Sequence, residues 1–337
     1  MEKKRPVIAI TVGDPHGVGS ELVLKSLNNK DIYQKAIPLV ISDMKLLERT
    51  EEFVDTQFKF DKISEIGEAK GRFGYIDVLD VPNIRWNEFC WGQVSEMAGK
   101  ASLNYVEAAM KLAMNGDIDA FVYGPLHKEN MKRAGLKHSS EAEYMQELVG
   151  SGQIIIFLIG EKSIITRVTT HVPFKDVPNY ITKENVLRAI KMTDDIMKRL
   201  SFDRPRIGIA ALNPHVGEGG LCGREEIDVI GPAIEAAREQ HVEVVGIYPA
   251  DTLYLGFEKN FRDGKLDVGI YMYHDIAGLT SKMLELGEMF TLTAGLPVPV
   301  LTVGHGTRYR RAGKGESKET SMTNAIQFAT RVRREGV

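Results

Sequence analysis

The chain has 337 residues, and its 43 Lys and Arg residues against 46 Asp and Glu residues give a formal net charge of −3. With 43% hydrophobic and 26% charged residues, the composition excludes wholesale disorder, and the length suits two α/β domains or one large one. The charge balance indicates neither nucleic acid nor a membrane surface as a partner, and two cysteines exclude a disulfide framework.

The hydrophobic pattern predicts an intracellular α/β protein. The apolar run near the start breaks at Gly13 and is interpreted as a strand rather than a signal peptide. The longest apolar stretch, 154–159, is far shorter than the roughly 20 residues of a membrane span. We therefore expect a protein of the reducing cytoplasm with no membrane segment.

Short apolar runs alternate along the chain with longer amphipathic ones, which predicts a mostly parallel sheet. Strands are predicted at 6–12, 37–41, 118–123, 154–159, 163–169, 206–212, 242–247, 267–273 and 298–303. Helices are predicted at 21–27, 104–114, 225–239 and 322–334, with a further helix that begins after Thr182 as N-cap. Residues 52–90 give mixed signals that fit an insertion or antiparallel strands, and 257–265 resembles a polar loop.

Reactive side chains follow the predicted strands. Ligands of open parallel sheets bind beyond the carboxyl ends of the strands. Six of the eight histidines lie just past such an end, namely His16, His127, His171, His215, His274 and His305. This placement predicts one polar site assembled from several loops.

Three histidines and an aspartate are sufficient to bind a divalent ion. Imidazole suits zinc and its neighbours, and carboxylate admits magnesium or manganese. The spacings between His171, His215 and His274 are long and contain no HxxxH motif. Each histidine caps or lines its own loop in the alternative interpretation, and spacing alone does not decide between the two.

Three glycine-rich loops are candidates for ligand binding. Residues 13–19, GDPHGVG, lie between a strand and a helix but do not match GxGxxG, so a tight turn is as good an interpretation as phosphate binding. Residues 213–220, NPHVGEGG, form the second loop. The third loop, residues 313–315, follows three arginines that face either a dinucleotide phosphate or solvent.

These motifs together resemble the 4-hydroxythreonine-4-phosphate dehydrogenase (PdxA) family over nearly the whole chain. The motifs are ITVGDPHGVGSELV (10–23), YGPLHKENMKRAG (123–135), TTHVPFKDVP (169–178), LNPHVGEGGLCGREEID (212–228), PADTLY (249–254), YHD (273–275), GLPVPVLTVGHGT (295–307) and AGKG (312–315). The resemblance implies an isocitrate/isopropylmalate-dehydrogenase-like fold with two α/β domains around a cleft, and not a Rossmann fold. The corresponding domains are 1–127 with 290–337 for the dinucleotide, and 128–289 for metal, substrate and dimerisation.

The resemblance also assigns roles to individual residues. The metal ligands are His171, His215 and His274, two from one subunit and one from the partner, which implies a homodimer with a shared active site. The resemblance implies Asp251 as an acidic residue of the site and Lys282 as a lysine that contacts substrate. We add Lys128 to these candidate catalytic residues, because Lys128 or Lys282 could transfer a proton or anchor the substrate; a loop salt bridge is the alternative for Lys128. The implied dinucleotide loop contains His305, Gly306, Thr307, Gly313 and Gly315. Gly13 and Asp14 of the first glycine-rich loop are added as candidates for the same ligand.

The sequence departs from the family pattern at the substrate positions. Family members read GHTE where this chain reads SEAE, so that Glu141 and Ala142 replace a histidine and a threonine. Thr291 stands for an asparagine, Val300 for an arginine and Lys318 for an aspartate. Loss of cationic partners for a phosphate or carboxylate predicts an altered substrate pocket.

The predicted activity is oxidation of a secondary alcohol with hydride transfer to NAD or NADP, together with decarboxylation, on a 4-hydroxythreonine-4-phosphate-like substrate. It requires a divalent metal: zinc, or magnesium, manganese or cobalt. One alternative is a dehydrogenase for a non-phosphorylated diol or sugar acid, such as a cis-dihydrodiol dicarboxylate. A second is a metal- or ligand-binding homologue without catalysis.

Overall fold

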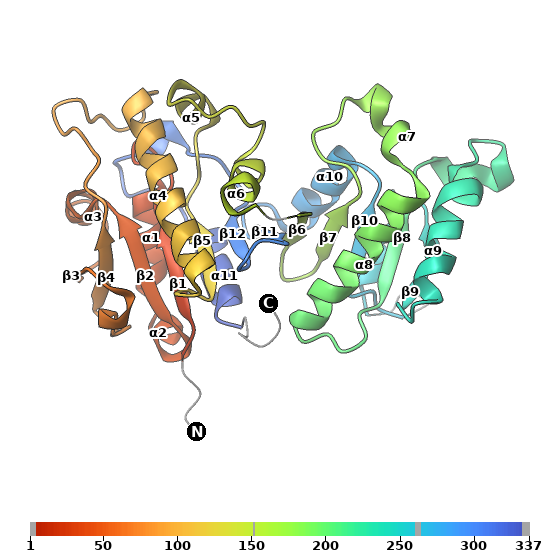
Figure 1. Ribbon diagram of the computed structural model, residues 1–337, viewed down its shortest axis with the longest axis horizontal. Coiled ribbons are helices and arrows are strands. Elements are labelled where there is room, and N and C mark those ends of the chain that lie inside the picture. The colour runs from red at the N-terminus through yellow and green to blue at the C-terminus, as the bar shows by residue number, and fades with distance from the viewer. Residues whose placement is uncertain (1–4, 151, 260–263, 332–337) are drawn as a thin grey trace. The chain divides into compact units, whose positions relative to one another are not determined.

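The computed structural model describes residues 5–150, 152–259 and 264–331. The described chain forms two compact units. Unit 1 contains the residues up to Ile154 and those from Phe290 onward, and unit 2 contains Ile155–Met289. Each unit is an α/β layer structure in which helices cover a mainly parallel sheet (Figure 1).

The boundary between the units differs from the one predicted at 127/128. Helices α5 (Lys128–Arg133) and α6 (Glu141–Val149) pack against α4 (Glu96–Asn115), so this part of the chain belongs to unit 1. Met145 of α6 is completely buried in the same apolar cluster as Phe121. Strand-end motifs do not show which way the following helices fold back, and this is why the sequence placed the boundary too early.

The sheet of unit 1 has the strand order β3-β4-β2-β1-β5-β12-β11. Its strands are β1 (Val7–Thr11), β2 (Ile37–Ser42), β3 (Lys59–Ile63), β4 (Tyr75–Asp80), β5 (Ala120–Tyr123), β11 (Phe290–Ala294) and β12 (Val300–Val303). All neighbours pair in parallel except β11 with β12. The antiparallel alternative for 52–90 is therefore wrong, because β3 and β4 run parallel to each other.

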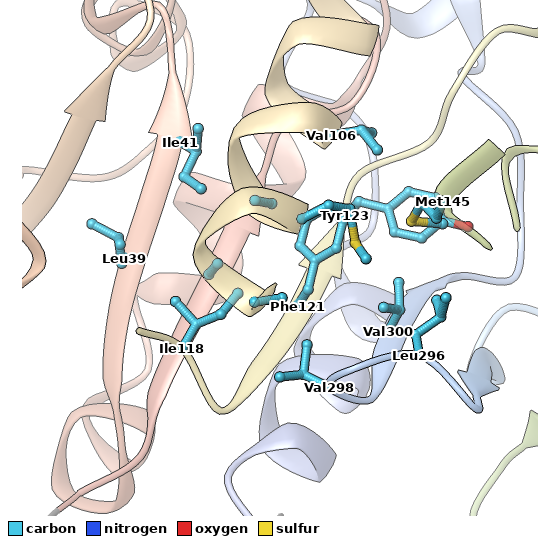
Figure 2. Packing of buried hydrophobic residues seen from close by; sticks show 14 of the residues in the cluster. Leu39, Ile41, Val106, Ile118, Phe121, Tyr123, Met145, Leu296, Val298 and Val300 are labelled. Carbon is cyan, nitrogen blue, oxygen red and sulfur yellow. The ribbon is translucent and has the colours of Figure 1, made fainter. Parts of the chain in front are cut away.

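Helices cover both faces of this sheet (Figure 1). Helix α4 lies over one face, and α1 (Gly19–Leu27) and α11 (Thr320–Ala329) lie over the other. The shorter helical segments are α2 (Lys30–Lys35), α3 (Met44–Glu51), η1 (Ile66–Glu68) and η6 (Tyr309–Arg311). Figure 2 shows the core under α4, where Val106 approaches the sheet residues Phe121, Tyr123 and Val300.

The sheet of unit 2 has the order β6-β7-β10-β8-β9. Its strands are β6 (Ile155–Ile159), β7 (Ile164–Arg167), β8 (Ile207–Ala210), β9 (Val244–Tyr248) and β10 (Val268–Tyr271). Strands β6 and β7 form an antiparallel hairpin, and the other pairs are parallel. The hairpin agrees with the turn predicted between 159 and 163.

Helix α10 (His274–Glu285) packs on β7 and β10 of unit 2, and α8 (Lys183–Arg199) packs with α9 (Gly231–Arg238). The short segments are η2 (Phe174–Asp176), α7 (Val177–Tyr180), η3 (Pro214–Gly220), the π-helical η4 (Glu226–Ile230) and η5 (Leu253–Phe257). Thr182 caps α8 as predicted, because its side chain accepts a hydrogen bond from the Asn185 N–H.

Two sequence predictions reach beyond the described residues. The closing helix predicted at 322–334 is α11, and its last three predicted residues lie outside the described part; the loop at 257–265 is described except for 260–263. Within the described residues, every helix is too short or too polar to cross a membrane.

Candidate active site

Two of the predicted metal ligands lie side by side at one edge of the unit 2 sheet. His171 follows β7 and His274 begins α10 directly after β10, and the centroids of their rings are 5.4 Å apart. The Nδ1 atom of His274 lies 2.8 Å from Oδ1 of Asp275. A hydrogen bond from Nδ1–H to this carboxylate leaves Nε2 as the lone-pair nitrogen, which is how metal-binding histidines are commonly oriented.

The first turns of α10 line an open pocket. His274, Asp275, Gly278, Leu279 and Lys282 contribute to its wall, so the predicted substrate lysine and one predicted metal ligand share a single depression. Asp251 is exposed in the turn after β9 and is absent from the lining of this pocket.

The third predicted ligand, His215, stands in a strained loop. Residues 215–219 have φ values of 53°, 60°, 75°, 47° and 68°, a left-handed run in which three residues are not glycine. His171 also has a positive φ of 32°. L-residues pay about 1–2 kcal/mol each for this conformation. Strain of this kind collects at functional sites, and here it falls on two of the three predicted ligands.

A buried carboxylate holds the strained loop in place. Glu226 of η4 accepts hydrogen bonds at 2.8 Å from the backbone N–H groups of Leu212 and Asn213. The Asn213 side chain donates to Glu225 at 2.6 Å and to Glu226 at 2.9 Å. These bonds fix the residues that precede His215 and stabilise the loop against its own strain.

The donor set suits a divalent cation only in part. Imidazoles from His171 and His274 are ligands that zinc and its neighbours prefer. Among the described residues of this chain, no group of three or more His, Cys, Asp or Glu side chains is arranged to hold a metal ion. The chain thus brings two predicted ligands together and does not add His215 to them.

Unit 1 contains a second group of polar side chains, built around a buried acid in the turn after β1. Asp14 is fully buried and accepts hydrogen bonds from the His16 backbone N–H at 2.9 Å and from Asn130 Nδ2 at 2.7 Å. The same Asn130 nitrogen donates to the Tyr309 hydroxyl at 2.6 Å, and the Tyr309 ring stacks on His127 with centroids 4.6 Å apart. Burial raises the pKa of Asp14 and, with Asp14 nearby, raises the pKa of Tyr309 well above its usual range.

Asn130 and Tyr309 were missed by sequence reasoning. Asn130 lies in the first turn of α5, three residues past His127, and a search carried one turn further beyond each strand end would have included it. Tyr309 follows a basic loop and has no sequence signal of its own. Only the fold brings it to Asp14.

The predicted dinucleotide loop closes against the turn after β1 and against helix α1. The Val18 N–H donates to the Thr307 carbonyl at 3.2 Å, and Lys25 Nζ donates to the Gly315 carbonyl at 2.7 Å. A Cβ on Gly313 would lie 2.7 Å from the Trp91 ring, and one on Gly13 would collide with the backbone of Gly124. Close packing between loops therefore accounts for these two glycines.

His305 and Gly306 stand at the start of this loop. His305 Nδ1 lies 3.0 Å from the Gly306 carbonyl, and burial lowers the pKa of the imidazole. A Cβ on Gly306 would meet no atom within 4 Å, so open space adjoins the backbone there.

The predicted substrate residues of unit 1 do not gather around one opening. Val300 is 1% exposed in the core beside Phe121, and Ala142 is buried in α6. Both side chains pack in unit 1, because β12 lies inside the sheet and α6 packs on α4. Their contact with substrate stays a prediction. Glu141 faces Tyr123 and raises the pKa of that hydroxyl, although less than burial does.

The two remaining predicted residues are more accessible. Thr291 is partly exposed on β11, and Lys128 is exposed at the start of α5, where the chain turns away from β5. Among the residues that the structure describes, neither side chain forms a hydrogen bond that assigns it a role.

Mainly parallel α/β units with polar groups past the strand ends are typical of α/β proteins that bind ligands at that edge. Comparison with known sequences makes this class specific. A model of the family "Pyridoxal phosphate biosynthetic protein PdxA" matches residues 34–329. The chain belongs to this family. The fold class predicted for the chain, with two α/β domains, is confirmed.

Named relatives span nearly the whole chain. A protein of Oceanobacillus iheyensis, named provisionally as a D-threonate 4-phosphate dehydrogenase, is 36% identical over 97% of both chains. The crystal structure of a 4-hydroxythreonine-4-phosphate dehydrogenase from Burkholderia phymatum is 36% identical, with a TM-score of 0.84 over 98% of this chain and 100% of that one. A terephthalate 1,2-cis-dihydrodiol dehydrogenase from Burkholderia xenovorans is 26% identical, with a TM-score of 0.68 over 97% and 98% of the two chains. The chain is accordingly an oxidoreductase that acts on CH–OH groups.

Proposed function

We propose that this chain is a divalent-metal-dependent NAD(P) dehydrogenase that oxidises, with decarboxylation, the secondary alcohol of a 4-hydroxythreonine-4-phosphate-like substrate. The observation that carries the proposal is the pair of imidazoles, His171 and His274, on one sheet edge, with Lys282 in the pocket that His274 lines. The named relatives support the substrate class, since two of them act on phosphorylated hydroxy acids by name.

The residues of the proposed site would act in distinct ways. His171 and His274 would hold the cation, whose Lewis-acid charge favours ionisation of the substrate hydroxyl. Asp275 keeps the His274 ring in the tautomer that presents Nε2. Lys282 would anchor the substrate or move a proton, and Lys128 and Asp251 are further candidates for proton transfer. The loops at 13–14, 305–307 and 313–315 would bind the dinucleotide that accepts the hydride.

The third imidazole would come from His215 of the partner subunit in a homodimer. Leu279 and Met283 of α10 and Leu286 at its C-cap are exposed apolar side chains and form an apolar stripe that begins in the pocket at Leu279. Apolar stripes of this kind mark protein–protein contacts. A second copy of this chain on α10 would cover the stripe and complete the ligand set.

A second candidate is a dehydrogenase for a non-phosphorylated diol. It is favoured by Val300, whose position in the core leaves no cationic side chain there, and by the likeness to the terephthalate dihydrodiol enzyme. The dehydrogenase names of the relatives leave the non-catalytic alternative without support.

Substrate and cofactor are tested by turnover. Purified protein with Zn²⁺ or Mn²⁺ is mixed with 4-hydroxythreonine-4-phosphate, D-threonate 4-phosphate or terephthalate cis-dihydrodiol, each with NAD or NADP, and absorbance at 340 nm is followed. We expect reduced dinucleotide with a phosphorylated substrate, loss of activity with a chelator and recovery on adding the metal back. Turnover of the diol alone would favour the second candidate.

Metal binding is tested by comparing two histidine variants, one at a predicted ligand and one at an exposed control position. His274→Ala is expected to abolish turnover and zinc binding by calorimetry, whereas His241→Ala, at an exposed histidine in the turn before β9, should leave both unchanged. Full zinc affinity in His274→Ala, or unchanged turnover by protein stripped of metal, would contradict the ligand assignment.

A further inference from the structure

Arg167, the last residue of β7, is a buried cation without a counter-ion. Its side chain is 9% exposed, and β7 lies between β6 and β10. Within the described part of the chain, no group accepts a hydrogen bond from its guanidinium or forms an ion pair with it, and Nε is fully buried. Burial alone lowers the pKa of Arg167 to about 10, which leaves it charged at neutral pH.

A second polar group beside Arg167 also lacks a partner. The sheet register pairs Arg167 with Tyr271 of β10, so the two side chains lie on the same face of the sheet. The Tyr271 hydroxyl is near Thr280 of α10 but, among the described residues, has no hydrogen-bond partner of acceptable geometry. Two buried donors thus stand on neighbouring strands with no acceptor between them.

Folded proteins rarely leave such donors unsatisfied. Arginine is almost never fully buried unless it is paired, and an unpaired buried charge costs free energy that the fold must supply. The guanidinium fork matches the two oxygens of a carboxylate or phosphate. The missing partner of Arg167 therefore has the chemistry of an oxyanion.

The position of Arg167 connects this anion site to the histidine pair. Beyond the strand ends the two chains stay joined, since the Val168 N–H donates to Tyr271 O at 2.8 Å and the Thr169 hydroxyl donates to Met272 O at 2.9 Å. His171 and His274 each follow two residues after that last bond. Arg167 and the histidines therefore belong to the same edge of the same pair of strands.

We propose that Arg167, with the Tyr271 hydroxyl, binds an oxyanion group of the substrate, either its carboxylate or its phosphate. The inference rests on the proposed function, which places the reacting hydroxyl at His171 and His274. It makes Arg167 a specificity residue for acidic substrates, a role that an apolar residue at this strand position would not fill.

Anion binding is tested first without turnover. Calorimetric titrations with inorganic phosphate and, separately, with malonate compare the natural protein with Arg167→Met, Arg167→Lys and the control Arg199→Met, at an exposed arginine of α8. We expect Arg167→Met to weaken binding of one of the two anions at least tenfold. A loss of this size is about what one hydrogen bond to a charged group contributes to binding. The anion affinity of Arg167→Lys should lie between that of Arg167→Met and that of the natural protein. The anion affinity of Arg199→Met should equal that of the natural protein. The anion affected identifies the substrate group.

Turnover supplies the second readout. With the phosphorylated substrate, Arg167→Met should raise KM at least roughly tenfold and lower kcat much less, because it removes binding shared by ground state and transition state. Without anion, the unfolding temperature of Arg167→Met should not fall below that of the natural protein. The substitution removes an unpaired buried charge and keeps an unbranched side chain of similar length. Equal anion affinity in Arg167→Met and the natural protein, or no binding of either anion, would overturn the proposal. Failure of turnover with intact anion binding would refute the proposed activity and leave Arg167 as an anion site.

Discussion

At the scale of single residues, the imidazole of His305 links stability to pH. Burial lowers its pKa below the usual value of about 6.5, with a smaller contribution from Arg308. The unfolded chain therefore binds a proton more readily than the folded chain as the pH falls below that value, and the free energy of unfolding decreases. We expect His305→Gln to unfold with a smaller difference between pH 8 and pH 5 than the natural protein, in urea titrations at both pH values.

The result separates this histidine from the other titrating groups, because only the difference between the two proteins is interpreted. An identical pH dependence in both would show that the ring is as easily protonated in the folded chain as in the unfolded one. The buried Nε2 atom of His305, which has no partner in the described structure, makes that outcome unexpected.

Sequence reasoning found single residues where chain position carries the signal. The strand-end positions predicted one polar site, and the family resemblance singled out His171 and His274 within it; the structure places their rings 5.4 Å apart. Arg167 was not expected, since an arginine inside an apolar run gives no sign of whether its head reaches solvent. Its importance lies in what is missing around it, and that is a property of the folded neighbourhood only.

At the scale of elements, the packing of α4 on α5 depends on Gly99. A Cβ at this position would overlap the carbonyl oxygen of Asn130, the residue that holds Asp14. Alanine is normally the better helix former by about 1 kcal/mol, but here the overlap should prevail. We expect Gly99→Ala to lower the free energy of unfolding by about 1–3 kcal/mol, as overpacking does.

The matched control is Lys100→Ala, which places the same side chain at the next, exposed position of α4. It should change stability by less than about 0.5 kcal/mol. Both variants are compared with the natural protein by thermal and urea unfolding. A more stable Gly99→Ala would mean that helix propensity outweighs the contact with Asn130 and that α5 can move away.

Elements were predictable where hydrophobic burial is complete and less so at edges. The apolar run of β1 is entirely buried, so its pattern is unambiguous. Strand β3, at the sheet edge, has the sequence KFDKI and only one fully buried residue, which explains why 52–90 gave mixed signals. Helix α10 was not predicted from the sequence. It begins with His274 and Asp275 and contains Gly278, so its sequence resembles a loop that follows a strand.

At the scale of the whole molecule, the motifs revealed the family but not the division of the chain. Residues 128–154 contain family motifs that the sequence assigned to the second domain, yet Met145 packs in the core of unit 1. A domain boundary is set by which face a helix buries, and that depends on partners distant in sequence. Val300 illustrates the same point, because a departure at a substrate position became a core residue.

The apolar stripe on α10 supports the proposed homodimer. Leu279, Met283 and Leu286 are 59%, 79% and 81% exposed, a run of large apolar side chains that a second copy would cover. Met283→Glu would bury a charge in this contact and should weaken self-association by roughly 100-fold or more, a cost of a few kcal/mol for an unpaired interfacial charge. Sedimentation velocity at micromolar concentration should then show monomer, with an unchanged far-ultraviolet dichroism spectrum.

Met114→Glu, at a methionine of α4 in unit 1 that is 50% exposed, provides the matched control and should sediment like the natural protein. Because His215 of the partner subunit would complete the metal site, monomeric Met283→Glu should also lose zinc affinity and turnover; a monomer that keeps both would place the third ligand elsewhere.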